Sequence, residues 1–305
     1  MYERYNPREE LLKFIKGGSI LSRLLIINVG VWLFVSVILV FAFLFNVMEE
    51  SVQGFIIDFL AVPSALDRLA VRPWTLFTYM FLHINLLHIL FNLLWLYWFG
   101  KIFLQFLNQK QLLATYIFGG LAGGILYIFA YNIFPVFREA LPYSSALGAS
   151  ASVMAIVTAI SFFTPNYFIH LFLIGRVRIV YVAIVLFVLD FFMIKSSNAG
   201  GHIAHIGGAI YGFIYAGYLR RGKDWSHLVD LFNLGGVKRY FTTSKKTTDT
   251  SGTTDSRPLT DEEYNYRKAE QQKVIDKILD KISKSGYDSL TKEEKEILFR
   301  SSNRN

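Results

Sequence analysis

The feature that most constrains this chain is a set of apolar runs too long for the core of a soluble domain. The first run, residues 24–47, contains no charged residue. About 20 apolar residues in a helix cross the roughly 30 Å of hydrocarbon in a bilayer. A soluble α/β core would instead have shorter apolar elements bounded by turn residues. With 53% hydrophobic residues overall, the sequence predicts an integral membrane protein.

The apolar runs recur along the first two thirds of the chain, which predicts an all-α polytopic membrane protein. We expect six transmembrane helices at about residues 24–47, 86–104, 112–132, 147–163, 179–194 and 202–219. The connection 48–73 is long and partly apolar, which predicts short interfacial helices. The expected domains are a cytosolic N-terminal segment (1–19), a six-helix membrane domain (20–222), an interfacial helix with a Ser/Thr-rich linker (223–259) and a small cytosolic helical tail (260–305).

The net charge of +8 indicates a membrane protein rather than a protein that binds nucleic acid, because of where the basic residues lie. Lysine and arginine gather near the two ends of the apolar region and in alternate short loops, as the positive-inside rule describes. This placement predicts that both termini are cytoplasmic, in a multi-pass protein of a bacterial inner (plasma) membrane. Because the chain has no cysteine, it has no thiolate nucleophile, disulfide or cysteine metal site.

Four polar residues lie near the outer ends of three expected spans. Ser150 is near the start of the fourth span, His205 is one turn into the sixth, and His88 and Asn92 are one turn apart on the second. Polar groups are costly in hydrocarbon, so they are functional candidates. A serine becomes nucleophilic when a base such as histidine takes its proton, and acyl transfer needs donors for the oxyanion. The set predicts hydrolysis of a peptide bond within the membrane.

Small residues on two of these spans predict close helix packing. Gly208 and Gly212 follow His205, and Ala151 and Ala155 follow Ser150, each pair one turn apart. Such surfaces let helices approach closely, which would bring Ser150 and His205 together. Simpler interpretations remain open for single residues: a membrane serine often bonds its own helix backbone, and His83 fits an interfacial anchor as well as a catalytic group.

The ordered motifs resemble those of the rhomboid family of intramembrane serine proteases. They are Arg72-Pro-Trp-Thr-Leu-Phe-Thr-Tyr-Met-Phe-Leu-His83, His88-x-x-x-Asn92, Gly148-Ala-Ser150 and Ala204-His205-Ile-Gly-Gly208-x-x-x-Gly212. The resemblance covers about residues 20–220. Ala151 stands where the family commonly has glycine, and Met154 where some members place a tyrosine against the base.

This resemblance implies a serine endopeptidase that cleaves other membrane proteins in or near their transmembrane segments. Ser150 would be the nucleophile and His205 its base, in a dyad without an acid. His88, Asn92 and the Ser150 backbone amide would form the oxyanion hole, with no metal and no cofactor. The fifth span and a cap loop at 195–201 would gate a water-filled cavity, whereas Asp190 in the fifth span has no implied role.

Two other functions are compatible with parts of the pattern. A catalytically silent rhomboid-like protein would bind membrane clients without cutting them, although loss of Ser150 or His205 would be its simplest mark. A transporter or channel would need polar groups at several depths, whereas these gather near one face. The tail at 260–305 could bind a cytosolic partner, and its Thr291-x-x-Glu294 pattern predicts a capping box.

Overall fold

The computed structural model describes residues 18–171, 175–232, 278, 280–282, 290–291 and 294–295. The chain divides into two compact units, Met1–Ser244 and Lys245–Asn305. In the second unit, the Thr291 N–H donates to Glu294 Oε2 (2.8 Å) and the Glu294 N–H donates to Thr291 Oγ1 (3.2 Å), which confirms the predicted capping box. The expected N-terminal segment, linker and most of the tail helices lie outside the described residues.

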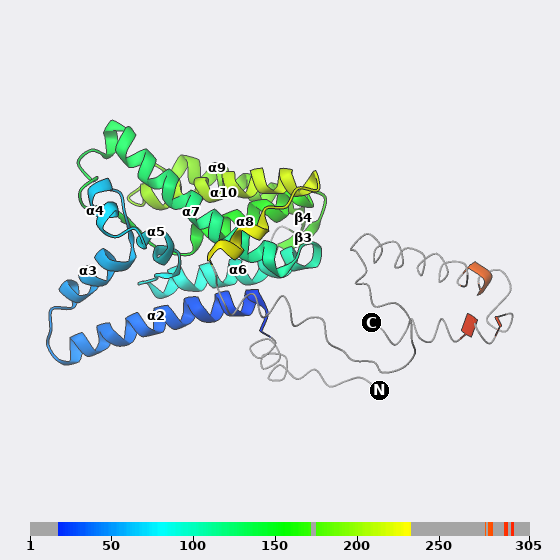
Figure 1. The fold of residues 1–305 in the computed structure, drawn as a ribbon, viewed down its shortest axis with the longest axis horizontal. Coiled ribbons are helices and arrows are strands. Elements are labelled where there is room, and N and C mark those ends of the chain that lie inside the picture. Colours follow the sequence, from blue (N-terminus) through cyan, green and yellow to red (C-terminus); the bar gives the residue numbers. More distant parts are fainter. Residues whose placement is uncertain are drawn as a thin grey trace. The chain divides into compact units, whose positions relative to one another are not determined.

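The first unit is a helical bundle, which confirms the expectation of a mostly helical protein (Figure 1). Its main helices are α2 (Ile20–Leu44), α6 (Leu86–Phe106), α7 (Gln109–Ile133), α8 (Ser150–Phe163), α9 (Ile179–Met193) and α10 (Ala199–Arg220). Within the described residues, α2, α6 and α7 are long and apolar enough to cross a membrane, and α8 and α9 are apolar but shorter.

Helix α8 is the centre of the bundle because small residues let two neighbours approach its backbone. Residues 151–161 of α8 are all buried. A Cβ added to Gly208 or Gly212 of α10 would meet the carbonyl group of Ala151 or Ala155, respectively. On α7, Gly119 and Gly123 face the same two alanines, and this second glycine pair was not predicted. Side chains larger than alanine on α8 would separate these helices.

Helix α2 lies beside α6 at the edge of the bundle (Figure 1). Most of its large apolar side chains are exposed, as are those of α9. Apolar surface on this scale is rare on monomeric soluble proteins, and it marks a face made for contact with lipid or protein. The buried Asn28 side chain of α2 donates to the hydroxyl of Tyr116 on α7 (3.0 Å), so its polar group is satisfied inside the bundle.

The connection between α2 and α6 forms short helices, as predicted. They are α3 (Glu49–Leu60), α4 (Leu66–Val71), α5 (Thr75–Thr78) and the 3-10 helix η1 (Tyr79–Phe81). Arg72 forms an ion pair with Asp58 of α3 (2.8 Å), and the Trp74 indole donates to the Phe59 carbonyl (2.9 Å). These contacts fix the connection ahead of α6.

Two short sheets were not predicted. Strand β1 (Val62–Pro63) pairs antiparallel with β2 (Ser145–Ala146), with Val62 opposite Ala146. Strands β3 (Phe168–Leu171) and β4 (Gly175–Arg178) form a second antiparallel pair, in which Phe168 faces Arg178. The 3-10 helix η2 (Pro135–Phe137) follows α7, and another, η3 (Ser226–Phe232), follows α10 and buries Val229.

Two expected boundaries were wrong. The fourth helix begins at Ser150 rather than at residue 147, because residues 145–146 pair as a strand and Gly148 has φ = +116°, outside the helical region. The expected cap loop at 195–201 is shorter, because α10 already begins at Ala199. Gly201, expected in the loop, is therefore a helix residue.

Candidate active site

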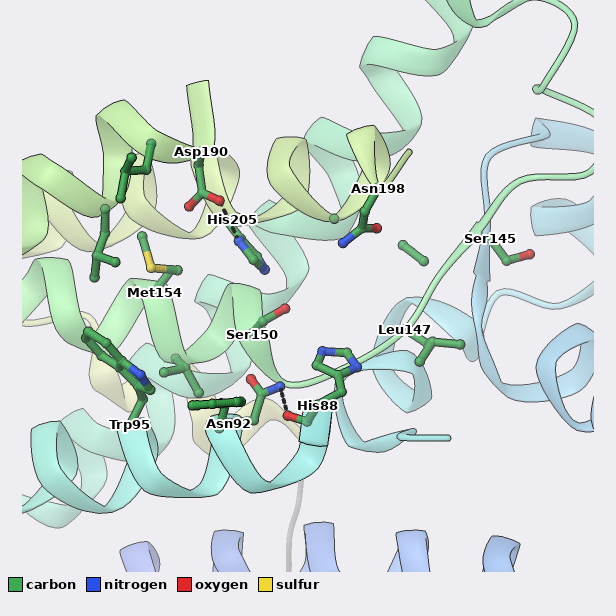
Figure 2. Close-up of a pocket in the computed structure, with 16 residues that line it drawn as sticks. His88, Asn92, Trp95, Ser145, Leu147, Ser150, Met154, Asp190, Asn198 and His205 are labelled. Carbon is green, nitrogen blue, oxygen red and sulfur yellow. Dashed lines mark hydrogen bonds and ion pairs between the residues drawn. The ribbon is translucent and has the colours of Figure 1, made fainter. Parts of the chain in front are cut away.

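The four predicted polar residues line one cavity of about 590 Å³. Ser150 comes from the start of α8, His205 from α10, and His88 and Asn92 from the first turns of α6. Figure 2 shows the Ser150 hydroxyl pointing into the space between the His205 and His88 rings. The remaining wall includes apolar side chains of α6 and α9, so polar groups gather at one end of a largely apolar cavity.

A tight turn places Ser150 at the cavity. Gly148 adopts φ = +116°, which few other residues tolerate, and its N–H donates to the Tyr79 carbonyl (2.8 Å). The next residue, Ala149, donates its N–H to Nε2 of His83 (3.2 Å). Both bonds connect the turn to the segment before α6, so they fix the backbone just ahead of Ser150.

His83 is fully buried and anchors the turn before Ser150 through the hydrogen bond from Ala149. Its Nε2 accepts from Ala149, so its Nδ1 carries the hydrogen, 3.3 Å from the Phe81 carbonyl. His83 lies in the segment that precedes α6. Burial, together with the neighbouring His88, lowers the pKa of His83 to about 4. A neutral His83 suits both bonds. Full burial and a position outside the cavity lining fit neither the interfacial anchor nor the catalytic group considered from the sequence, and His83 is instead a buried structural group.

Three groups able to donate hydrogen bonds belong to residues that line the cavity: the His88 ring, the Asn92 amide and the Ser150 backbone N–H. The His88 ring lies against Gly148, since a Cβ on that glycine would be 2.6 Å from His88 Cε1. The Asn92 amide donates to the His88 carbonyl (2.8 Å) and keeps a second hydrogen for another acceptor. Because Ser150 is the first residue of α8, its backbone N–H has no partner within the helix. A negative oxygen placed here would find donors on two sides.

His205 has an acidic neighbour that the sequence resemblance did not imply. Nδ1 of His205 lies 2.9 Å from Oδ1 of Asp190 on α9, and Nδ1 of His202 lies 2.7 Å from the same oxygen. Asp190 is 8% exposed. The resemblance implied a dyad without an acid, whereas the structure places a carboxylate beside the histidine of that pair.

The same three side chains are also a set that could hold a metal ion, with ligand atoms within 4.8 Å of one another. Zinc ligands at about 2.0–2.1 Å from the metal lie roughly 3.3 Å apart in a tetrahedron. The nitrogen–oxygen distances of 2.7 and 2.9 Å are shorter than this and match hydrogen bonds. The geometry favours direct hydrogen bonding.

Ser152, the other serine near the start of α8, does not line the cavity. It is fully buried, its hydroxyl faces the Met80 sulfur at 3.9 Å, and it lies against Gly120 of α7. Ser150 lines the cavity instead. The two serines are two residues apart on one helix, so they face different sides of it.

A comparison with known protein families matches the part of the chain that contains the cavity. The Rhomboid domain family matches residues 71–222, which contain the whole cavity. The chain belongs to the rhomboid family. A second match, at residues 260–304, is to a family of unknown function (DUF6576).

Two curated relatives are rhomboid-like proteins. RHOMBOID-like protein 12, mitochondrial, from Arabidopsis thaliana is 29% identical over 161 residues, covering 50% of this chain and 48% of the relative. Presenilin-associated rhomboid-like protein A, mitochondrial, from Danio rerio is 28% identical over 149 residues, covering 45% of this chain and 35% of the relative. This rhomboid thus spans half or less of each relative's length.

These relatives correct one expectation. The prediction of a bacterial inner membrane with both termini cytoplasmic is overturned, because both relatives are mitochondrial by name. The loop charges had indicated only that alternate loops lie on the same side, and that pattern does not identify the membrane. The expectation of a membrane protein itself is retained.

Sequence reasoning missed the roles of two residues that the cavity depends on. Asp190 was noted, and a charged residue inside an apolar span is a functional candidate, but nothing in the sequence indicated its partners. The buried role of His83 also depends on a contact made 66 residues along the chain, at Ala149. The spacing of His202 and His205 by three residues was a usable signal, since it puts both on one helix face.

Proposed function

We propose that this rhomboid is an intramembrane serine endopeptidase that hydrolyses peptide bonds of other membrane proteins in or near their transmembrane segments. The observation that carries the proposal is the single cavity lined by Ser150, His205, His88 and Asn92. A hydroxyl, an imidazole and amide-type donors from three helices are the groups that acyl transfer requires.

The proposed reaction begins when the Ser150 Oγ attacks the carbonyl carbon of the scissile bond. Its proton passes to Nε2 of His205, and the carbonyl oxygen becomes an oxyanion. The His88 and Asn92 side chains and the Ser150 backbone N–H would donate to that oxygen. As the intermediate collapses, the C–N bond breaks and the leaving amine takes the proton from His205. Water then attacks the acyl-enzyme carbonyl while His205 accepts its proton, and on collapse the C–Oγ bond breaks and His205 returns the proton to Ser150 Oγ.

The cavity wall supports an apolar, membrane-embedded substrate. Phe91 of α6 and Leu189 of α9 both line the cavity, yet they are 57% and 51% exposed on the outer surface. The cavity therefore reaches the lipid-facing side between α6 and α9. A transmembrane segment of another protein could enter there without leaving an apolar environment.

We further propose that α8, α9 and α10 also lie within the bilayer, which gives six membrane helices. Helix α8 has 14 residues and is about 21 Å long at 1.5 Å per residue, shorter than the roughly 30 Å hydrocarbon layer. Its burial among α7 and α10 supports this placement, because a helix enclosed by protein does not need to match the bilayer.

A fluorophosphonate probe tests the proposal directly. We expect the wild-type protein, in detergent micelles, to be labelled and to cleave a model single-span substrate. Ser150→Ala should lose both, whereas Ser152→Ala, two residues away on the same helix, should remain labelled. Labelling that persists in Ser150→Ala would refute the assigned nucleophile. A wild-type protein that binds the substrate but is neither labelled nor able to cleave it would be a client-binding protein.

A further inference from the structure

Asp190 is a carboxylate in an otherwise apolar helix. Its neighbours Leu189, Phe191 and Phe192 on α9 are large and exposed to the surroundings of the bundle, whereas Asp190 is buried toward α10. Burying a carboxylate is costly unless hydrogen bonds compensate it. The two imidazole nitrogens at 2.7 and 2.9 Å provide this compensation.

We propose that Asp190 is a positioning residue that converts the Ser150–His205 pair into a Ser–His–Asp arrangement; this inference rests on the proposed function. A carboxylate oxygen only accepts hydrogen bonds, so Nδ1 of His205 carries the hydrogen. Nε2 of His205 is then the free base. Figure 2 shows the His205 ring between the Asp190 carboxylate and the Ser150 hydroxyl.

The arrangement contributes in two ways. The hydrogen bond fixes the tautomer and the orientation of His205 before reaction, and the negative charge stabilises the imidazolium that forms when His205 takes the serine proton. The fixed tautomer is needed for proton transfer rather than for substrate binding, and the charge stabilisation develops only as the imidazolium forms, so both effects should act on kcat more than on KM.

His202 is the second donor to Asp190, from one turn earlier on α10. Its ring meets the His205 ring edge to face at a centroid distance of 5.9 Å. Asp190 and His205 line the cavity, whereas His202 is not among its lining residues. His202 therefore holds the Asp190 carboxylate through a second hydrogen bond, so that Asp190 keeps the orientation that His205 needs.

The kinetic test compares Asp190→Asn with Asp224→Asn in the full-length protein. Asp224, just after α10, also accepts several hydrogen bonds but lies outside the cavity lining. We expect Asp190→Asn to lower kcat by on the order of 10²- to 10⁴-fold with KM changed only a few-fold, and Asp224→Asn to keep kcat. Asp190→Glu, which restores the charge, should recover part of the lost kcat. A kcat for Asp190→Asn within about threefold of wild type would overturn the proposal.

A spectroscopic test does not depend on activity. In ¹⁵N-histidine NMR spectra of the protein in micelles, with His205→Gln used for assignment, neutral His205 should be the Nδ1-protonated tautomer. Asp190→Asn should shift it toward the Nε2-protonated form, which is the commoner one in solution. An unchanged His205 signal would refute the positioning role. If the wild type shows this tautomer but neither cleaves nor labels, the proposed function fails while the positioning contact stands.

A chelator separates this role from a metal site. Wild-type activity that is unaffected by EDTA supports direct hydrogen bonding by Asp190. Activity that EDTA abolishes and zinc restores would overturn it and assign the three side chains to a metal.

Discussion

Replacing Gly208 by alanine should push α10 away from α8. The added Cβ would lie 2.8 Å from the carbonyl carbon of Ala151 and 3.2 Å from its Cα, and nearer still to its oxygen. Ordinary carbon–carbon contacts are about 3.5–4.0 Å. Because the obstructing atoms are backbone, they cannot rotate aside, and the two helices must separate by roughly 1 Å.

The expected cost follows from two opposing terms. Overpacking of a tight interior costs about 1–3 kcal/mol, and more when backbone must move. Alanine in place of glycine in a helix returns up to about 1 kcal/mol. With the clash at the upper end of its range, Gly208→Ala should lower the free energy of unfolding by about 2 kcal/mol.

Gly217 provides a matched control on the same helix. A Cβ there would meet nothing within 4 Å, so Gly217→Ala should be neutral or stabilising by up to about 1 kcal/mol. Unfolding of both variants in mixed micelles measures the difference. Stability changes of the same sign and size in the two variants would refute the close-packing argument.

Gly208→Ala should also lower the rate at which the folded protein cleaves its substrate. A separation of roughly 1 Å moves His205 relative to Ser150, and misplacement on this scale can cost on the order of 10²-fold in rate. Cleavage of a model single-span substrate by the folded fraction of each variant tests this. A Gly208→Ala rate within a few-fold of the Gly217→Ala rate would show that this helix contact does not position the proposed catalytic pair.

Two further predictions concern charge. The folded-state pKa of His83, about 4, is below its ordinary value of 6.5, so the unfolded chain binds more protons between these values; stability should fall as pH falls from 6.5 toward 4, by about 3 kcal/mol. His83→Gln, which keeps an acceptor for Ala149, should flatten this slope in unfolding experiments, and an unchanged slope would contradict the assignment. Burial acts to raise the pKa of Asp224, but hydrogen bonds from Ser226, Tyr215 and Gln111 lower it overall. Its contribution is therefore present above the ordinary value of 3.8 and lost as pH falls through the lower folded value. Asp224→Asn should cost about 1–2 kcal/mol at neutral pH, a figure discounted because the group is partly exposed, and wild type and variant should converge in acid.

Helix positions were predictable because a long apolar run has few alternatives to a membrane helix. The ends were less accurate where a single side chain or glycine decides them. The first helix begins at Ile20, because the Ser19 hydroxyl accepts from the Ser22 N–H (3.1 Å), and it ends at Leu44, two residues before Asn46, which has φ = 54°. The later start of α8, at Ser150 rather than residue 147, depends on strand pairing of residues 145–146 with residues 62–63, and a distant partner leaves no local signal.

Part of the candidate site was likewise predictable from the sequence, and part was not. Ser150, His205, His88 and Asn92 could be chosen from the sequence because each is polar in an apolar run and all four have similar depth. Asp190 met the same criterion, but its partners are 12 and 15 residues away on another helix. The contact depends on how α9 is rotated against α10, and apolar composition on all sides of α9 leaves that rotation open.

The sequence by itself determined that this chain is a helical membrane protein with rhomboid motifs, because hydrophobic length and motif order are properties of the chain alone. Only the tertiary structure decided that a second glycine pair, on α7, also packs against α8, that His83 holds the turn before Ser150, and that Asp190 meets His205. These depend on distances of about 3 Å between segments far apart in sequence. Hydrogen bonds and backbone contacts weaken or clash within fractions of an ångström, and no pattern along the chain specifies separations that small.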